Sequence, residues 1–204
     1  GSTGLPKGVM NTHENVTTNW QQITQVFPFF EEGFTLIDWL PWNHTFGGNH
    51  NFGLTLYHGG SLYIDGGNPT PGGTKITVEN IRKIAPTIYF NVPKGFEELL
   101  PYLREDADFR AQFFKNLKLL FYAGAGMSQV VWDALEDLSV QETGKRVFIS
   151  TGLGCTESSP SALFNTHEDS FSGLLGVPVS GLSLKLVPNG GKLEARFKGK
   201  NVMP

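Results

Sequence analysis

The chain has 204 residues, of which 39% are hydrophobic and 17% charged, and its formal net charge is −3. This composition is typical of a globular protein with a sizeable core, and the charge balance excludes a basic surface for nucleic acid or an anionic membrane. The single cysteine, Cys155, excludes an internal disulfide and a Cys-x-x-Cys metal site. No signal peptide or transmembrane stretch is visible, so we expect a cytoplasmic protein.

The first half of the chain alternates predicted helices and strands. Thr12 is a suitable cap for a helix whose apolar residues, from Val16 to Phe27, follow a helical spacing. A strand over residues 35–40 ends at Pro41, and a second strand covers residues 61–64. The segment between them, residues 45–58, predicts either a helix weakened by three glycines or an irregular coil.

The same alternation continues through the middle of the chain. Strands are predicted over residues 87–92, 117–123 and 146–150, and helices around Val78–Ile84 and over residues 96–103, 109–114 and the segment capped by Ser128. Strands that alternate with helices through short loops predict an α/β fold, a mostly parallel sheet with helices on both faces.

The pattern changes at about residue 173. Residues 182–187 and 192–197 flank Pro188-Asn-Gly-Gly191, which predicts an antiparallel hairpin. We therefore expect residues 1–172 to form the α/β part of a larger domain and residues 173–204 to begin a small antiparallel β subdomain. A glycine-rich loop without a preceding strand opens the chain, so we expect a central fragment, truncated at both ends.

Four glycine-rich or polar segments are candidates for chemistry. Gly1-Ser-Thr-Gly-Leu-Pro-Lys-Gly8 offers backbone N–H groups, hydroxyls and a lysine to an anion, although it lacks the residue order of the ATPase P-loop. Leu40-Pro-Trp-Asn-His-Thr-Phe-Gly47, Tyr122-Ala-Gly-Ala-Gly-Met127 and Thr151-Gly-Leu-Gly-Cys-Thr-Glu157 each follow a predicted strand, where parallel sheets bind ligands. Taken singly, a glycine-rich turn, a lone histidine such as His44 or a lone Glu157 is more often structural or solvated.

In order and spacing, these segments resemble the adenylate-forming superfamily of acyl-CoA synthetases, peptide-synthetase adenylation domains and luciferases. Within that superfamily, Leu-Pro-Trp-Asn-His and Gly-Leu-Gly-x-Thr-Glu are most similar to feruloyl-CoA synthases. The matching segments are Gly1–Gly8, Asn11–Asn15, His44 with Gly47, Ala123–Gly126, Gly154–Glu157 and Lys192–Pro204.

The resemblance implies ATP-dependent activation of a small carboxylic acid as acyl-AMP, with Mg²⁺, followed by transfer to coenzyme A (CoA). The catalytic residues would be Lys7, His44, Thr156 and Glu157, with Glu157 on the metal. The nucleotide would contact Ser2, Thr3, Gly4, Lys7, Gly8, Gly124, Ala125, Gly126, Gly152, Leu153, Gly154 and Thr156. The acid would contact His44, Phe46, Gly47, Asn91 and Val92.

This sequence departs from the family pattern at two of these positions. Leu153 stands where the family has a ring that stacks on adenine, and Gly126 stands where proline is usual. The ribose-binding aspartate and the C-terminal adenylation lysine of the family lie outside the chain, so we expect these 204 residues alone to be inactive.

Three functions remain open from the sequence. The first is an acid–CoA ligase, the second an adenylation domain that loads a carrier protein, and the third a non-catalytic nucleotide-binding module. Rings near the presumed pocket are either core packing or contacts for a flat acid, and the similarity to feruloyl-CoA synthases favours a planar, hydroxycinnamate-like acid. These rings are Trp39, Trp42, Phe46, Phe52, Tyr89 and Phe90. Cys155 is predicted to be a packed small residue, and Trp20 and Trp132 to be core residues.

Overall fold

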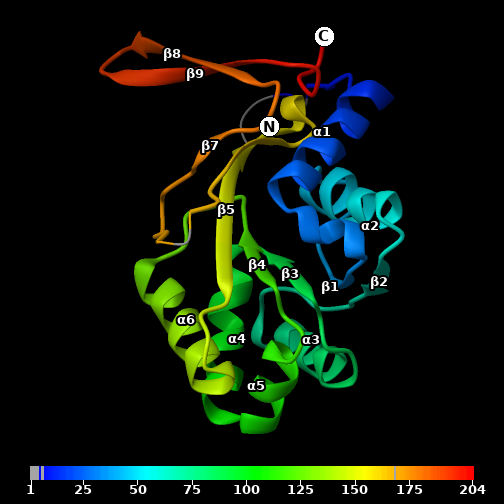
Figure 1. The fold of residues 1–204 in the computed structure, drawn as a ribbon, viewed down its shortest axis with the longest axis vertical. Helices are drawn as coiled ribbons and strands as arrows, with labels where there is room; N and C mark the ends of the chain where they lie inside the picture. Colours follow the sequence, from blue (N-terminus) through cyan, green and yellow to red (C-terminus); the bar gives the residue numbers. More distant parts are fainter. Residues whose placement is uncertain (1–4, 6, 168) are drawn as a thin grey trace.

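A five-stranded sheet with the order β3-β4-β5-β6-β7 forms the centre of the computed structural model, which describes residue 5, residues 7–167 and residues 169–204 (Figure 1). Strands β3, β4 and β5 are parallel, whereas β6 and β7 run antiparallel to their neighbours. The strands are β1 (Thr35–Asp38), β2 (Ser61–Ile64), β3 (Ile88–Asn91), β4 (Leu119–Tyr122), β5 (Phe148–Gly154), β6 (Ser161–Phe164), β7 (Val177–Pro178), β8 (Ser183–Asn189) and β9 (Lys192–Lys198).

The predicted helices are present, with ends that differ by a few residues. They are α1 (His13–Val26), α2 (Gly53–Tyr57), α3 (Pro71–Lys83), α4 (Pro93–Glu105), α5 (Ala107–Phe114) and α6 (Gln129–Thr143), with 3₁₀ turns η1 (Pro28–Glu32) and η3 (Thr156–Ser158). The glycine-containing segment 45–58 begins as a π-helix, η2 (Phe46–Phe52), before it continues as α2. The structure therefore confirms a helix there, but with a wider first turn than the sequence predicts.

Both faces of the parallel strands are buried, which confirms the α/β prediction. Tyr89 and Leu120 point to one core, which α3, α4, α5 and α6 cover. Their neighbours Phe90 and Phe121 point to a second core, which contains Ile23 of α1. Successive strand residues face opposite sides of a sheet, so each strand supplies both cores.

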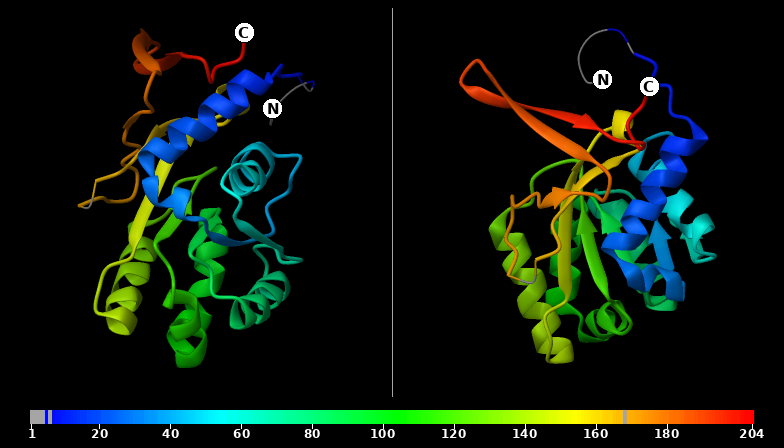
Figure 2. Two further views of the ribbon diagram at one scale, coloured as in Figure 1. Left: turned by 45° about the vertical axis from the view of Figure 1, so that its right-hand side comes forward. Right: turned by 45° about the horizontal axis from the view of Figure 1, so that its top comes forward.

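The predicted hairpin is confirmed as β8 and β9, a separate antiparallel sheet that extends away from the rest of the chain (Figures 1 and 2). Strand β7, although it follows residue 173, pairs with β6 in the central sheet. No helix in the described part of the chain combines the length and the apolar character that crossing a membrane requires.

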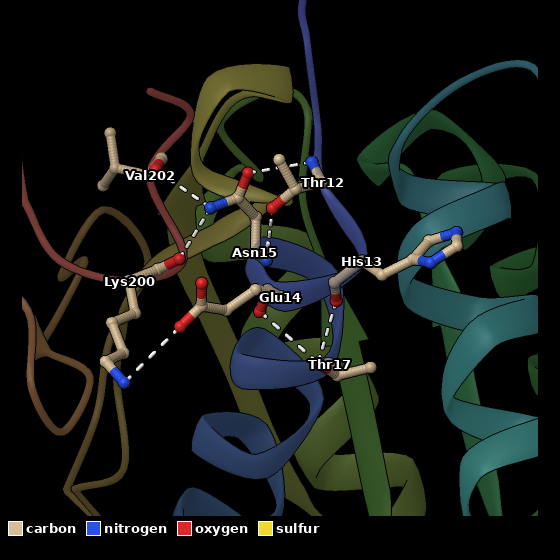
Figure 3. Close-up of polar contacts among 7 residues, drawn as sticks. All are labelled: Thr12, His13, Glu14, Asn15, Thr17, Lys200 and Val202. Atoms are coloured by element: carbon tan, nitrogen blue, oxygen red, sulfur yellow. Dashed lines mark hydrogen bonds and ion pairs between the residues drawn. The ribbon is translucent and has the colours of Figure 1, made fainter.

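The start of α1 is bonded to the segment that follows β9 (Figure 3). Thr12 and Asn15 form a reciprocal capping box, in which each side chain accepts a hydrogen bond from the other residue's backbone N–H. The Asn15 amide nitrogen also donates to the carbonyl oxygens of Lys200, at 2.7 Å, and Val202, at 3.1 Å. One asparagine thus caps the helix and holds a segment almost 190 positions away.

Three further buried amides extend this contact to β6. Asn201, with no exposed surface, donates to the carbonyl oxygens of Ser158 and Ser161 at 3.1 and 3.0 Å. Gln22 of α1 donates to the Asn201 oxygen at 3.3 Å, and Asn19 donates to Ser161 at 2.8 Å. Because each partner is buried, removing one amide leaves polar atoms without hydrogen bonds.

We expect Asn201→Ala to lower the free energy of unfolding by roughly 1–3 kcal/mol, because the buried Ser158 carbonyl loses its donor, whereas the Ser161 carbonyl keeps that from Asn19. Urea unfolding followed by circular dichroism measures the change. The matched control is Asn189→Ala on the exposed hairpin, which should stay within about 0.5 kcal/mol of the wild type. Equal effects of the two substitutions would contradict the role of the buried network.

Candidate active site

A cavity of about 580 Å³ opens at the carboxyl ends of β4 and β5. In parallel α/β sheets this edge is where ligands bind, because strand-to-helix loops converge there. Three chain segments supply most of its lining: 44–46 with His50, 121–126, and 151–157. Residues of β6 and the loop that contains Gly173 complete it.

The cavity brings together most of the site residues predicted from the sequence. Those that line it are His44, Phe46, Gly124, Ala125, Gly126, Gly152, Leu153, Gly154, Thr156 and Glu157. Lys7 and Gly8 lie in the exposed segment before α1 and are not part of the lining. The predicted phosphate contacts Ser2, Thr3 and Gly4 lie outside the described residues.

Three residues predicted to contact the acid do not line the cavity: Gly47, Asn91 and Val92. A Cβ on Gly47 would lie 2.5 Å from the carbonyl oxygen of Pro41, so this glycine lets η2 pack against the preceding backbone. Asn91 is 1% exposed, and its amide donates to the Tyr89 hydroxyl and accepts from the Val92 N–H, at 3.0 and 2.8 Å. Asn91 therefore fixes the end of β3.

The rings predicted to surround the acid are arranged differently from the expectation. Of the six, Phe46 lines the cavity, while Tyr89 packs against Phe96 in the opposite core. Trp42 packs on Phe52, with ring centroids 4.7 Å apart. Phe121 and Phe164, which the sequence analysis missed, line the cavity instead. The alternation of side chains along β3 and β4 decides which rings face it.

The loop after β4 presents bare backbone to the cavity. Gly124 has a φ of +87°, in the left-handed region that side chains disfavour, and it turns the chain out of the sheet. Gly126 has open space around its Cα, and Ser128 then caps α6 by accepting from the Val131 N–H at 3.3 Å. A flat group can therefore approach the backbone of residues 124–126 closely.

Strand β5 runs through Gly152 to Gly154, although the sequence predicts its end at residue 150. A Cβ on Gly152 would collide with the carbonyl oxygen of Leu163, and one on Gly154 with that of Pro160. Both glycines are therefore required by the close approach of β6. Leu153, between them, is the side chain of this run that lines the cavity.

Thr156 and Glu157 lie in η3 directly after β5, and both are exposed at the cavity. Two hydrogen bonds to their backbone carbonyls hold this segment in place. The Asn11 amide donates to the Thr156 carbonyl at 3.0 Å, and the Met203 N–H donates to the Glu157 carbonyl at 2.9 Å. Cys155 is also exposed, so the prediction that it packs as a small core residue is wrong. Trp132, predicted as core, is 1% exposed.

The donor set of the cavity fits Mg²⁺ bound together with a polyphosphate. Within the described ranges, no three His, Cys, Asp or Glu side chains cluster as metal ligands. The Glu157 carboxylate lines the cavity and makes no hydrogen bond or ion pair with another described residue. Mg²⁺ commonly takes one or two carboxylates and completes its shell with phosphate and water oxygens. Glu157 can supply the protein ligand.

Two histidines line the cavity with opposite hydrogen-bonding patterns. The Nδ1 atom of exposed His44 accepts from the Phe46 N–H at 3.1 Å, which leaves the proton on Nε2. His50, which the sequence analysis missed, is 2% exposed, and its Nδ1–H donates to the Asn51 amide oxygen at 2.8 Å. The rings of Phe90 and Phe121 lie 4.9 and 5.6 Å from the His50 ring.

Burial gives His50 and nearby Asp38 unusual pKa values. Desolvation lowers the pKa of His50 to about 4, so the imidazole is neutral near pH 7. Desolvation raises the pKa of Asp38 to about 6, although the hydrogen bond from the Leu40 N–H, at 3.0 Å, lowers it. The Asn51 nitrogen and the second Asp38 oxygen make no hydrogen bond of regular geometry with described residues, so this carboxylate is incompletely stabilised.

The two groups change stability in opposite directions between pH 4 and 6.5. The raised pKa of Asp38 gives stability that is complete below about pH 4 and lost as pH rises through about 6. The lowered pKa of His50 gives stability that is complete above about pH 6.5 and lost as pH falls towards 4.

We expect Asp38→Asn to remove the pH-dependent stability that Asp38 contributes. The unfolding free energy of the variant should fall relative to wild type by up to about 3 kcal/mol as pH decreases from 7 to 4. Urea unfolding at several pH values measures this difference. Asp137→Asn, at an exposed carboxylate of α6, is the control and should show a difference that is independent of pH. A flat difference for Asp38→Asn as well would overturn the assignment.

The chain is similar in sequence to CoA ligases. The chain is 31% identical over 191 residues to a long-chain-fatty-acid–CoA ligase of Salmonella typhimurium, covering 92% of this chain and 32% of the ligase. It is 28% identical over 212 residues to a feruloyl-CoA synthase of Amycolatopsis, covering 100% of this chain and 40% of that protein. The chain thus spans less than half the length of these relatives.

Solved structures share the fold. A long-chain-fatty-acid–CoA ligase from Archaeoglobus fulgidus superposes with a TM-score of 0.77 at 21% identity, covering 100% of this chain and 41% of the ligase. An anthranilate–CoA ligase in complex with anthranoyl-AMP gives 0.74 at 24% identity, covering 100% and 38%. The family model of AMP-binding enzymes matches residues 1–200. The chain therefore belongs to the family of AMP-binding enzymes.

Proposed function

We propose that the protein uses ATP to convert a carboxylic acid into an acyl-adenylate and then transfers the acyl group to CoA. The observation that carries this proposal is one cavity in which a hydrogen-bond-donating histidine, a bare backbone edge and a threonine–glutamate pair lie together. Family membership and the CoA ligases among its relatives support the same reaction class.

The first step joins the acid to the nucleotide. A carboxylate oxygen attacks the α-phosphorus of ATP, and the bond to the β-phosphate oxygen breaks, releasing pyrophosphate. In the second step the thiolate of CoA attacks the acyl carbon, a thioester forms and AMP leaves. Positioning and charge stabilisation dominate such reactions at phosphorus.

The nucleotide would occupy the side of the cavity formed by the loop after β4 and the end of β5. Adenine would lie along the backbone of residues 124–126, with Leu153 giving aliphatic contact. Thr156 would donate its hydroxyl to the α-phosphate, and the segment containing Lys7 would bind the outer phosphates. Mg²⁺, when bound with Glu157, would neutralise charge on the phosphate oxygens.

The acid would occupy the side formed by η2 and β4. His44 carries a proton on Nε2, so its ring can donate a hydrogen bond to the acid carboxylate and orient it for attack. Phe46, Phe121 and Phe164 line the space beyond. Rings favour flat aromatic ligands by offset-stacked or edge-to-face contacts, and one relative is a feruloyl-CoA synthase. We therefore propose an aromatic, hydroxycinnamate-like acid.

The test is acid-dependent pyrophosphate release by the full-length protein with ferulate, benzoate, octanoate and acetate in the presence of CoA. We expect kcat/KM for ferulate to exceed that for octanoate by about tenfold, the effect of two ring contacts. Preference for octanoate would overturn the aromatic acid but leave acid activation intact. Pyrophosphate release that no acid stimulates would overturn the proposed function.

We expect Lys7→Ala in the full-length protein to weaken ATP use by about tenfold to a hundredfold, the value of a charge-assisted contact. Transfer from pre-made acyl-AMP to CoA should change much less, because pyrophosphate has already left. The two half-reactions are measured separately by pyrophosphate and AMP release. Lys115→Ala, at an exposed lysine at the end of α5, is the control and should leave both unchanged. Equal losses in both half-reactions of Lys7→Ala would contradict the assignment.

A further inference from the structure

His50 places a hydrogen-bond acceptor in an otherwise apolar part of the cavity. Its Nδ1–H is used by the Asn51 oxygen, so Nε2 carries a lone pair and no proton. Nε2 makes no hydrogen bond with the described residues. Phe46, Phe90 and Phe121 surround the ring, with centroids 4.9–5.6 Å away.

The orientation of Asn51 fixes this arrangement. The side-chain oxygen of Asn51 lies 2.8 Å from His50 Nδ1, and an amide oxygen can only accept a hydrogen bond. The proton of the neutral imidazole is therefore on Nδ1. Asn51 thus holds His50 in the tautomer that offers an acceptor to the cavity.

Packing alone does not account for a histidine at this position. An apolar ring would fill the same space without the cost of removing an imidazole from water, and that cost lowers the pKa of His50 to about 4. The Asn51 contact satisfies one of the two ring nitrogens. The second nitrogen requires a partner that enters the cavity, either water or a group of the ligand.

We propose that His50 Nε2 accepts a hydrogen bond from a hydroxyl, or another N–H or O–H donor, carried by the acid at the end remote from its carboxylate. The inference rests on the proposed function and names the substrate class more closely: a planar acid with a hydrogen-bond donor on its ring. His44 and His50 then complement the two ends of one ligand, because His44 offers a proton to the carboxylate and His50 offers a lone pair to the donor.

The test compares three para-substituted cinnamates in acid-dependent pyrophosphate release by the full-length protein. The 4-hydroxy and 4-amino compounds carry a donor, whereas the 4-fluoro compound has similar size and none. For the wild type we expect kcat/KM of both donors to exceed that of 4-fluorocinnamate by about tenfold, because the unmatched acceptor would stay buried without a partner.

His50→Leu should reduce this ratio to near one, through loss of activity with the two donors and retention with 4-fluorocinnamate. His50→Gln, whose amide oxygen can accept, should restore part of the ratio and provides a second variant if leucine disturbs folding. The matched control is His58→Leu. His58 is half-buried among Phe30, Phe34 and Tyr57, and it contacts Thr24 outside the cavity lining. This control should leave the ratio unchanged.

The outcomes separate the inference from the function on which it rests. A wild type that does not distinguish the three acids, or a His50→Leu variant that lowers activity on all three equally, would overturn the role of His50 while acid activation stands. Pyrophosphate release that no acid stimulates would overturn both.

Discussion

Buried hydrogen bonds from amide side chains join the two ends of the described chain and thereby position the loop that follows β5. Asn15 and Gln22 of α1 contact the segment that contains Asn201, and Asn201 in turn holds the carbonyls of Ser158 and Ser161. Thr156 and Glu157 directly precede Ser158, so their position at the cavity depends on the hydrogen bond that Asn201 makes to the Ser158 carbonyl. A network of this kind is stabilising only when every member is satisfied, which makes it sensitive to single substitutions.

The sheet determines where chemistry can occur. Because both faces of β3 and β4 are buried in separate cores, polar groups that meet a ligand are confined to the loops at their carboxyl ends. Two of those loops use glycine for different reasons. Gly124 turns the backbone in a left-handed conformation, whereas Gly152 and Gly154 make room for the neighbouring strand β6. Backbone of the loops after β4 and β5 therefore lines one side of the cavity, and aromatic side chains of η2, β4 and β6 line the other.

The alternation of helices and strands, the hairpin and many of the residues that line the cavity could be predicted, because they depend on periodicity and on motifs that follow strand ends. The direction of individual rings could not, since one residue of register decides whether Tyr89 or Phe90 faces a given core. His50 was missed for a related reason. The π-helix adds a residue to each turn, so spacing rules for ordinary helices do not place it. Cys155 is exposed because the loop that contains it lies at the surface, and composition alone does not predict the position of a loop.

The two glycines of β5 also bear on how such a cavity can change in evolution or engineering. A side chain at Gly152 or Gly154 would meet the backbone carbonyl of Leu163 in β6 or of Pro160 just before it, and neither can move aside without disturbing the strand pair. The opposite wall consists of side chains, including Phe46, His50 and Phe121, that can be exchanged one at a time. New acid preferences should therefore arise by substitution in η2 and β4, while Gly152 and Gly154 should tolerate almost no substitution in a mutational library.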